Sequence, residues 1–146
     1  MIKDLANAGA IPALELTMRF AGARQKVIAH NIANIDTPNF QPKDVSPQHF
    51  QEMLGDAIEA RRAENGGASG DLDWRETRQI RHTDDGGLTL DPLTDSPNVL
   101  FHDRNDRDLE RLMQSMVENA GMYRVASDLL RQRYSMLRAA IAERAL

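Results

Sequence analysis

The sequence contains no cysteine and few aromatic residues, and both features restrict the kinds of fold and function that the protein can have. Without cysteine among its 146 residues, disulfide bonds, thiolate catalysis and cysteine-ligated zinc are excluded. Four Phe, two Tyr and one Trp predict a small core. No apolar run approaches the roughly 18 residues that a membrane-spanning helix needs. Residues 1–7 lack the basic and apolar pattern of a secretory signal, so we expect no cleavable signal peptide.

A basic excess is also missing. The formal net charge is −4, and residues 51–104 carry six Lys and Arg against twelve Asp and Glu. Each terminal part is close to neutral. Because nucleic-acid binding depends on a basic face that neutralises phosphates, we expect no nucleic-acid partner.

The C-terminal part, residues 105–146, has the pattern of one long helix. It contains no proline, and Asn105 or Asp106 can cap it, with Asp108 and Glu110 in its first turn. Apolar residues recur in steps of three and four, which is typical of a helix that packs along one stripe. The packing residues that this stripe predicts are Leu109, Met113, Met116, Ala120, Tyr123, Leu130, Tyr134, Leu137 and Ile141.

The N-terminal part, residues 1–40, predicts a second helix that begins near Pro12 and ends at Pro38. Its stripe has the same three–four spacing, interrupted by Ala21 and Gln25. A weaker stripe of Leu16, Phe20 and Val27 widens the apolar surface, as in helices with several neighbours. The packing residues that the main stripe predicts are Leu14, Met18, Ala21, Ile28, Ile32 and Ile35.

The middle part, residues 41–104, is less regular. Ser46 and Pro47 mark the start of a short amphipathic helix. Residues 64–73 predict a flexible loop, and residues 84–87 a hairpin turn. We therefore expect a mainly α fold. Its long terminal helices form one domain as an antiparallel coiled coil, around a middle that is loop-rich, partly disordered or a small β-hairpin.

The chemical groups of the chain do not form a recognisable catalytic or binding pattern. His30 has no second ligand or nucleophile at helical spacing, so we interpret it as a packing or surface residue. His102, Asp103 and Asp106 can be drawn as a metal site, but capping already explains Asp106. There is no glycine-rich phosphate loop and no constellation of paired carboxylates suited to acid–base catalysis. We expect no enzyme activity, no cofactor, no metal and no small-molecule substrate.

The end of the N-terminal helix and the residues that follow it read Ala29-His30-Asn31-Ile32-Ala33-Asn34-Ile35-Asp36-Thr37-Pro38-Asn39-Phe40. Its physical chemistry is that of a helix end, where asparagine amides can bond free backbone groups and a proline forces an extended exit. The residues that make up the motif are Asn31, Ala33, Asn34, Asp36, Thr37, Pro38 and Phe40.

As a sequence motif, this segment resembles the N-terminal signature of bacterial flagellar axial proteins, Ala-Asn-x-x-Thr-Pro-Gly-Tyr. Asn39 stands in place of the glycine, and asparagine is well suited to positive φ. Phe40 replaces the tyrosine and keeps the ring. The chain length, Lys43-Asp44-Val45 and the end of the C-terminal helix are similar to the proximal-rod proteins of that family, whereas residues 60–100 carry no strong resemblance.

The resemblance implies a structural subunit of the proximal rod of the flagellar basal body. Such a subunit would be made in the cytoplasm, exported by the flagellar type III apparatus, and would polymerise through its terminal helices to support motility. The implied partners are other rod subunits and further copies of itself, the adaptor protein FliE, and the membrane-ring and export-gate base. The alternatives are another rod subunit similar to FlgC, a non-flagellar coiled-coil binding module, and an export chaperone or regulator.

Overall fold

The structure is a computed structural model, and it describes residues 9–67, 69–84, 86–94 and 108–144. These residues form three helices, α2 (Ile11–Ala33), α3 (Pro47–Asn65) and α4 (Leu109–Arg144). They also form four short strands, β1 (Lys43–Asp44), β2 (Ile80–His82), β3 (Leu88–Leu90) and β4 (Leu93–Thr94). Helices dominate, which confirms the mainly α fold. Within the described ranges, no helix combines the length and the apolar character needed to cross a membrane.

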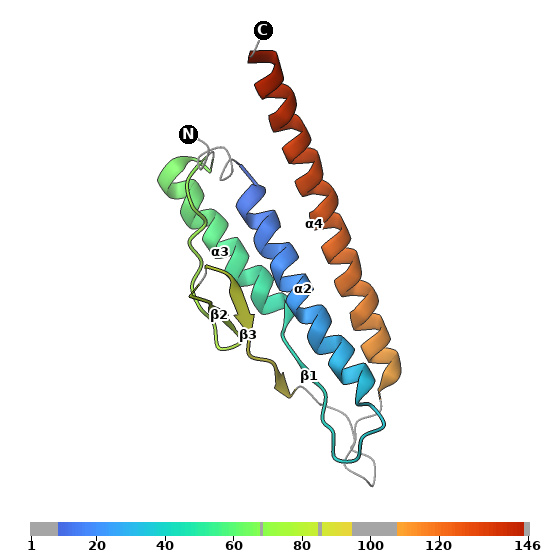
Figure 1. Cartoon of the computed structure of the whole chain (residues 1–146). Helices are drawn as coiled ribbons and strands as arrows, with labels where there is room; N and C mark the ends of the chain where they lie inside the picture. The colour runs from blue at the N-terminus through green and yellow to red at the C-terminus, as the bar shows by residue number, and fades with distance from the viewer. Residues whose placement is uncertain (1–8, 68, 85, 95–107, 145–146) are drawn as a thin grey trace.

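Helix α2 lies in the middle of the molecule, with α3 and the strands on one side and α4 on the other (Figure 1). Helix α4 runs antiparallel to α2, because its Asn119 contacts Ala21 and its later Tyr134 contacts the earlier Glu15. The C-terminal end of α4 extends past the start of α2. The two terminal helices therefore lie side by side, and their regular packing as a coiled coil stays a prediction.

Helix α2 begins as the sequence predicts but ends earlier. Pro12 lies at its first positions, where a missing N–H group costs nothing. The last helical residue is Ala33, so the prediction that Pro38 ends the helix was wrong. The side-chain amide of Asn34 donates to the His30 carbonyl at 2.8 Å and occupies a free acceptor at the helix end. Residues 34–37 then form a turn, with the Thr37 N–H donating to the Asn34 carbonyl.

The short middle helix and the hairpin are confirmed. The Ser46 hydroxyl accepts a hydrogen bond from the His49 N–H at 3.3 Å, and Pro47 is the first residue of α3. Gly66, at a φ of 64°, ends this helix in the left-handed conformation that glycine adopts without strain. Strands β2 and β3 pair antiparallel, with Ile80 opposite Leu90. A second antiparallel pair, β1 with β4, was not predicted.

Helix α4 begins at Leu109, later than the predicted caps, Asn105 and Asp106, would place its start. The carboxylate of Asp108 accepts a hydrogen bond from the Arg111 N–H at 2.9 Å, so Asp108 acts as the N-terminal cap. The predicted caps, Asn105 and Asp106, lie outside the described residues. The histidine and aspartate drawn beside Asp106 as a metal site also lie outside them.

The buried core lies between α2, α3 and the β2–β3 hairpin, not between the two terminal helices. The rings of Phe20 and Phe50 stack, with centroids 4.0 Å apart and planes 5° from parallel. Phe20 and Leu16 belong to the stripe of the N-terminal helix that the sequence indicated as the weaker one. Because burial of apolar side chains supplies most of the favourable folding free energy, this short stripe contributes more to the stability of the fold than its length suggests. The core residues are Leu16, Phe20, Val45, Phe50, Met53 and Ile80.

One ion pair fixes the chain after the α2 turn onto α2. The guanidinium of Arg24 is buried and donates to both carboxylate oxygens of Asp44 on β1, with the Nε–Oδ1 distance 2.9 Å. The Asp44 side chain keeps 30% of its surface exposed. A two-point arginine–carboxylate pair sets both distance and angle, so β1 is held at one level along α2.

We predict that Asp44→Asn lowers the free energy of unfolding by about 3 kcal/mol, because it leaves the Arg24 charge buried without its partner. The matched control is Asp91→Asn. Asp91 pairs with Arg81 at 2.6 Å, but both side chains are more than half exposed. Exposed pairs contribute about 0–1 kcal/mol. Urea denaturation of the purified chain measures both values, and equal losses would contradict the role given to Arg24.

Candidate functional site

The flagellar-type motif forms a chain reversal at the C-terminal end of α2. Asn31, only 2% exposed, donates from its amide nitrogen to the Lys43 carbonyl at 2.6 Å and accepts from the Lys43 N–H at 3.2 Å. One side chain thus pairs with both backbone groups of a residue that lies twelve positions later. Asn31 therefore fixes the returning chain directly beside α2.

Two consecutive turns make the reversal. After the turn from Asn34 to Thr37, the Phe40 N–H donates to the Thr37 carbonyl at 3.1 Å. Asn39 has a φ of 61° and is the only described non-glycine residue with positive φ. Asparagine tolerates this conformation better than other residues with a side chain, so the departure from the family glycine keeps the backbone path. The Phe40 ring then contacts His30 edge-on, with centroids 5.7 Å apart.

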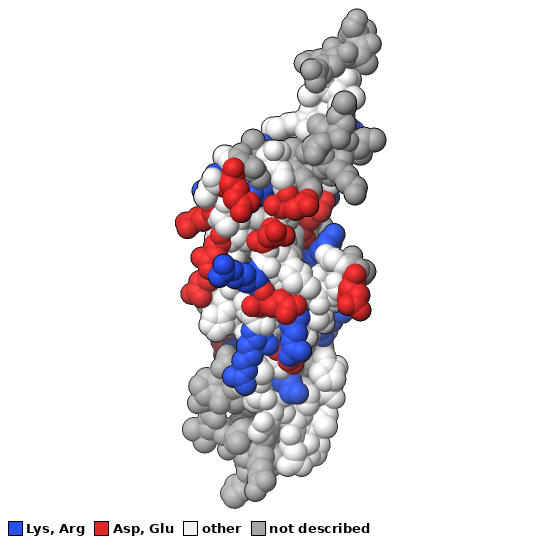
Figure 2. Space-filling view, turned by 90° about the vertical axis from the view of Figure 1, so that its left-hand side faces the viewer, with Lys and Arg blue, Asp and Glu red and all other residues white. Residues whose placement is uncertain are grey.

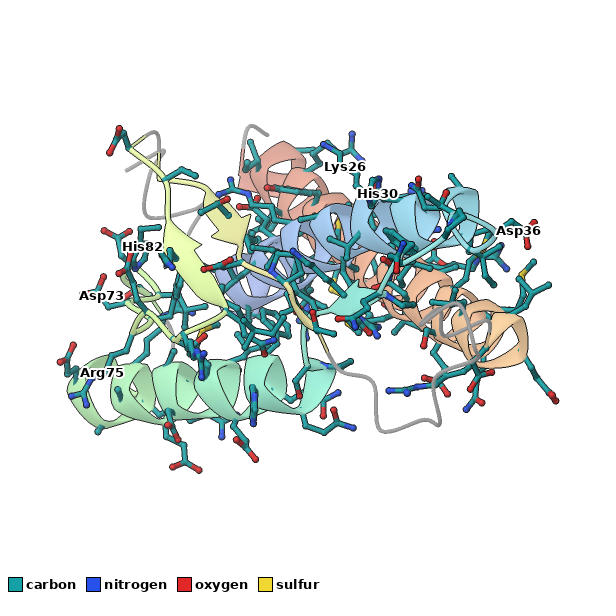
Figure 3. All side chains as sticks on the ribbon, turned by 90° about the horizontal axis from the view of Figure 1, so that it is seen from below. Lys26, His30, Asp36, Asp73, Arg75 and His82 are labelled. Carbon is teal, nitrogen blue, oxygen red and sulfur yellow. The ribbon has the colours of Figure 1, made fainter. Side chains whose placement is uncertain are left out.

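The outer residues of the motif face solvent in the isolated chain. Ala33, Asp36, Thr37 and Pro38 are exposed, whereas Asn34 and Phe40 are half-buried. Figure 3 places Asp36 at the end of α2 and at the opposite end of the molecule from Asp73, Arg75 and His82. The motif therefore combines an inner amide that fixes the fold with an exposed outer turn.

A second amide, which the sequence did not indicate, holds the same returning segment from its other side. Gln79 is 9% exposed. Its side chain accepts from the Ser46 N–H at 3.3 Å and donates to the Asp44 carbonyl at 3.2 Å. Together with Asn31 and Arg24, it clamps residues 43–46, which we call the clamped segment. Gln79 and Ser46 are 33 residues apart in the chain. No local sequence pattern could therefore predict this contact.

The predicted packing residues of the N-terminal helix lie on or near its buried sides. Ala21 and Ile28 are buried. Leu14, Met18, Ile32 and Ile35 are half-buried, and Ile35 lies in the turn beyond the end of α2. Buried Ile11 and Arg24 also lie on α2, although the sequence assigned Arg24 no role.

The predicted stripe of the C-terminal helix is largely open in the single chain. Leu130 and Leu137 are half-buried, and the exposed members are Leu109, Met113, Met116, Ala120, Tyr123, Tyr134 and Ile141. Among the residues of α4 whose burial the structure describes, Asn119 and Ala126 are buried, and the half-buried Met122 packs against the core. At 100° per residue, this buried face is rotated to one side of the predicted stripe.

Apolar residues also lie on the other side of the buried face. Val125, Leu129 and Met136 follow one another at steps of four and seven, and their exposed fractions are 60%, 44% and 51%. Helical geometry puts them on the flank opposite the predicted stripe. Helix α4 therefore presents two apolar flanks, one on each side of its contact with α2.

The contact between α4 and α2 is partly polar. The hydroxyl of Tyr134 donates to a carboxylate oxygen of Glu15 at 2.7 Å. This hydrogen bond to a carboxylate raises the pKa of Tyr134 above its ordinary value, with smaller effects of burial and of the Glu15 charge. The bond connects the outer part of α4 to the first turns of α2.

The opposite side of the molecule is charged rather than apolar. Figure 2 shows acidic side chains gathered over the upper half of this face and basic ones below them. A groove of about 570 Å³ runs between α3 and residues 73–79, and both carboxylate and guanidinium groups line it. Among the described residues, no group of three or more metal-ligating side chains comes together. The exposed apolar flanks of α4 are therefore the most distinctive surface.

Comparisons with known proteins agree with the motif. Residues 18–41 match the family model described as flagella basal body rod protein. Over 53 residues the chain is 45% identical to the flagellar basal body rod protein FlgB of Bacillus subtilis (strain 168). This match covers 36% of this chain and 41% of that protein.

Longer matches extend beyond the motif. The chain is 30% identical to FlgB of Borrelia hermsii over 108 residues, 73% of this chain and 76% of that protein. It is also 30% identical to FlgB of Yersinia enterocolitica over 115 residues, 79% of this chain and 80% of that protein. The chain therefore belongs to the family of flagellar basal body rod proteins and is FlgB-like.

Proposed function

We propose that the protein is a structural subunit of the proximal rod, polymerises through its terminal helices and is required for motility. One observation carries this proposal. The large apolar side chains that are exposed in the described part of the chain all belong to α4. Soluble monomers rarely expose this many large apolar side chains on one helix unless a partner covers them.

The two flanks of α4 favour neighbours on both sides of the helix. A coiled-coil binding module with one partner needs a single apolar stripe. The stripe of α4 that the sequence predicted, which we call the predicted flank, would be enough for such a module. Val125, Leu129 and Met136 on the other flank would stay exposed in such a pair. In a rod, each subunit meets several copies or relatives of itself, and heterologous contacts that do not close into a ring continue along a filament.

Export and the remaining partners rest on the family relationship. We propose export by the flagellar type III apparatus without a cleavable signal peptide, and contacts with FliE and with the membrane-ring and export-gate base. The exposed turn at Asp36, Thr37 and Pro38 offers a surface outside the α4 flanks for one of these neighbours. No catalytic step is proposed, because the family is structural and the site offers packing surfaces.

The location can be tested directly. We expect an immunoblot to detect this protein in purified, washed hook–basal bodies and not as a stable soluble oligomer. The control is a known cytoplasmic flagellar chaperone, which should be absent from the washed particle. Detection only in the soluble fraction would contradict the rod proposal and favour a binding module, a chaperone or a regulator.

The apolar flank can be tested with one added charge. We predict that Met113→Glu, at a side chain that is 46% exposed, leaves the free energy of unfolding within about 0.5 kcal/mol but removes the subunit from basal bodies. The loss follows because the carboxylate would be buried against a neighbouring subunit without a partner.

The matched control is Gln114→Glu, which adds the same charge at the next, exposed residue of α4. This variant should assemble and support motility. Normal assembly of Met113→Glu, or equal loss in both variants, would show that the predicted flank is not an assembly surface.

A further inference from the structure

A polar side chain lies in the middle of the contact between α2 and α4. Asn119 is 1% exposed, which makes it the most deeply buried described residue of α4. Its amide nitrogen donates to the backbone carbonyl of Ala21 at 2.9 Å and to the side-chain oxygen of Gln25 at 2.8 Å. Both acceptors belong to α2, so the two bonds connect the terminal helices directly.

The other half of this amide is not satisfied. The side-chain oxygen of Asn119 is buried and accepts no hydrogen bond from any residue that the structure describes. A buried acceptor without a donor destabilises the folded state, and an apolar side chain of similar size would avoid this cost. Stability alone therefore does not explain an asparagine at position 119. Its hydrogen bonds to α2 point to a second role.

The acceptors of Asn119 are the two positions that interrupt the apolar stripe of the N-terminal helix. Ala21 has a small side chain, which leaves its carbonyl oxygen within reach of a neighbouring helix. Gln25, one turn later, supplies the second acceptor. The interruptions in one helix and the buried amide in the other are thus complementary.

A shift of one heptad along the helix pair would separate these groups. A shift by seven residues in either direction would replace Ala21 by Ile28 or Leu14, and Gln25 by Ile32 or Met18. Those side chains are apolar and bulky, so both halves of the amide would be buried without partners. Single buried asparagines at core positions of coiled coils fix register in this way, at a cost in stability.

We propose that Asn119 fixes the register of α4 on α2. This register determines how far α4 extends past the start of α2, and the level at which its apolar flanks lie along the molecule (Figure 1). The inference rests on the contact within one chain, so it stands or fails independently of the rod proposal.

The absence of cysteine makes the register measurable by site-directed spin labelling. Nitroxide labels are attached to Ala29→Cys on α2 and Gln132→Cys on α4, two exposed positions at different levels of the helix pair. Pulsed electron resonance on the purified full chain gives the distance distribution. We expect one distance with Asn119 present and a second population in Asn119→Leu, displaced by about 10 Å, since seven residues rise about 1.5 Å each.

Two further variants make the outcome decisive. Ser127→Leu adds the same apolar group on the same stretch of α4 but keeps the amide, so it should show one distance. Asn119→Ala removes the amide without adding bulk and should also show the second population. This variant provides the test if Asn119→Leu fails to fold. One unchanged distance in both Asn119 variants overturns the proposal. Loss of the helical circular dichroism signal in both also overturns it, because Asn119 would then be needed for folding rather than for register.

Discussion

The fold depends on the clamped segment, residues 43–46, where the chain returns along α2. Asn31 pairs with both backbone groups of Lys43, Arg24 binds the carboxylate of Asp44, and Gln79 pairs with the backbone of Asp44 and Ser46. Because buried polar groups are costly when unpaired, these mutually satisfied bonds define one arrangement. The position of Ser46 sets where α3 begins, and α3 in turn brings Phe50 onto Phe20.

This arrangement divides the chain between two tasks. Helix α2, α3 and the hairpin bury the Phe20 core within the single subunit, so this side does not need a neighbour. Helix α4 adds little to that core and keeps apolar flanks on both sides of its contact with α2. The division suits a subunit whose folded body is complete and whose long helix is completed by other subunits.

The sequence predicted the helices and the hairpin better than it predicted which elements pack against one another. Periodicity predicted the three helices, helped by Pro12 in α2 and by Ser46 and Pro47 in α3, and the Asp-Asp-Gly-Gly turn predicted the hairpin, because these signals act within a few residues. The partner of an apolar face is not a local property. The stripe through Leu16 and Phe20 is the weaker one in the sequence, yet it forms the core, because α3 covers it.

The candidate site shows the same limit. The motif from Asn31 to Phe40 could be recognised as a sequence, and the asparagine amides could be expected to bond backbone groups. The targets of those bonds could not be predicted. Arg24 and Asp44 are 20 residues apart, and Asn119 lies 98 residues from Ala21. Such pairs become visible only when distant elements are placed together.

We propose that the exposed apolar stripe of α4 that includes Met113 is open in the free subunit and covered in the rod. A single cysteine introduced by Met113→Cys into the cysteine-free chain gives the most direct test. Its reaction rate with a water-soluble maleimide would be compared between the purified subunit and washed basal bodies. We expect rapid labelling of the free subunit and strong protection in the particle. Equal labelling of both would contradict this proposal, because the flank would then remain exposed after assembly.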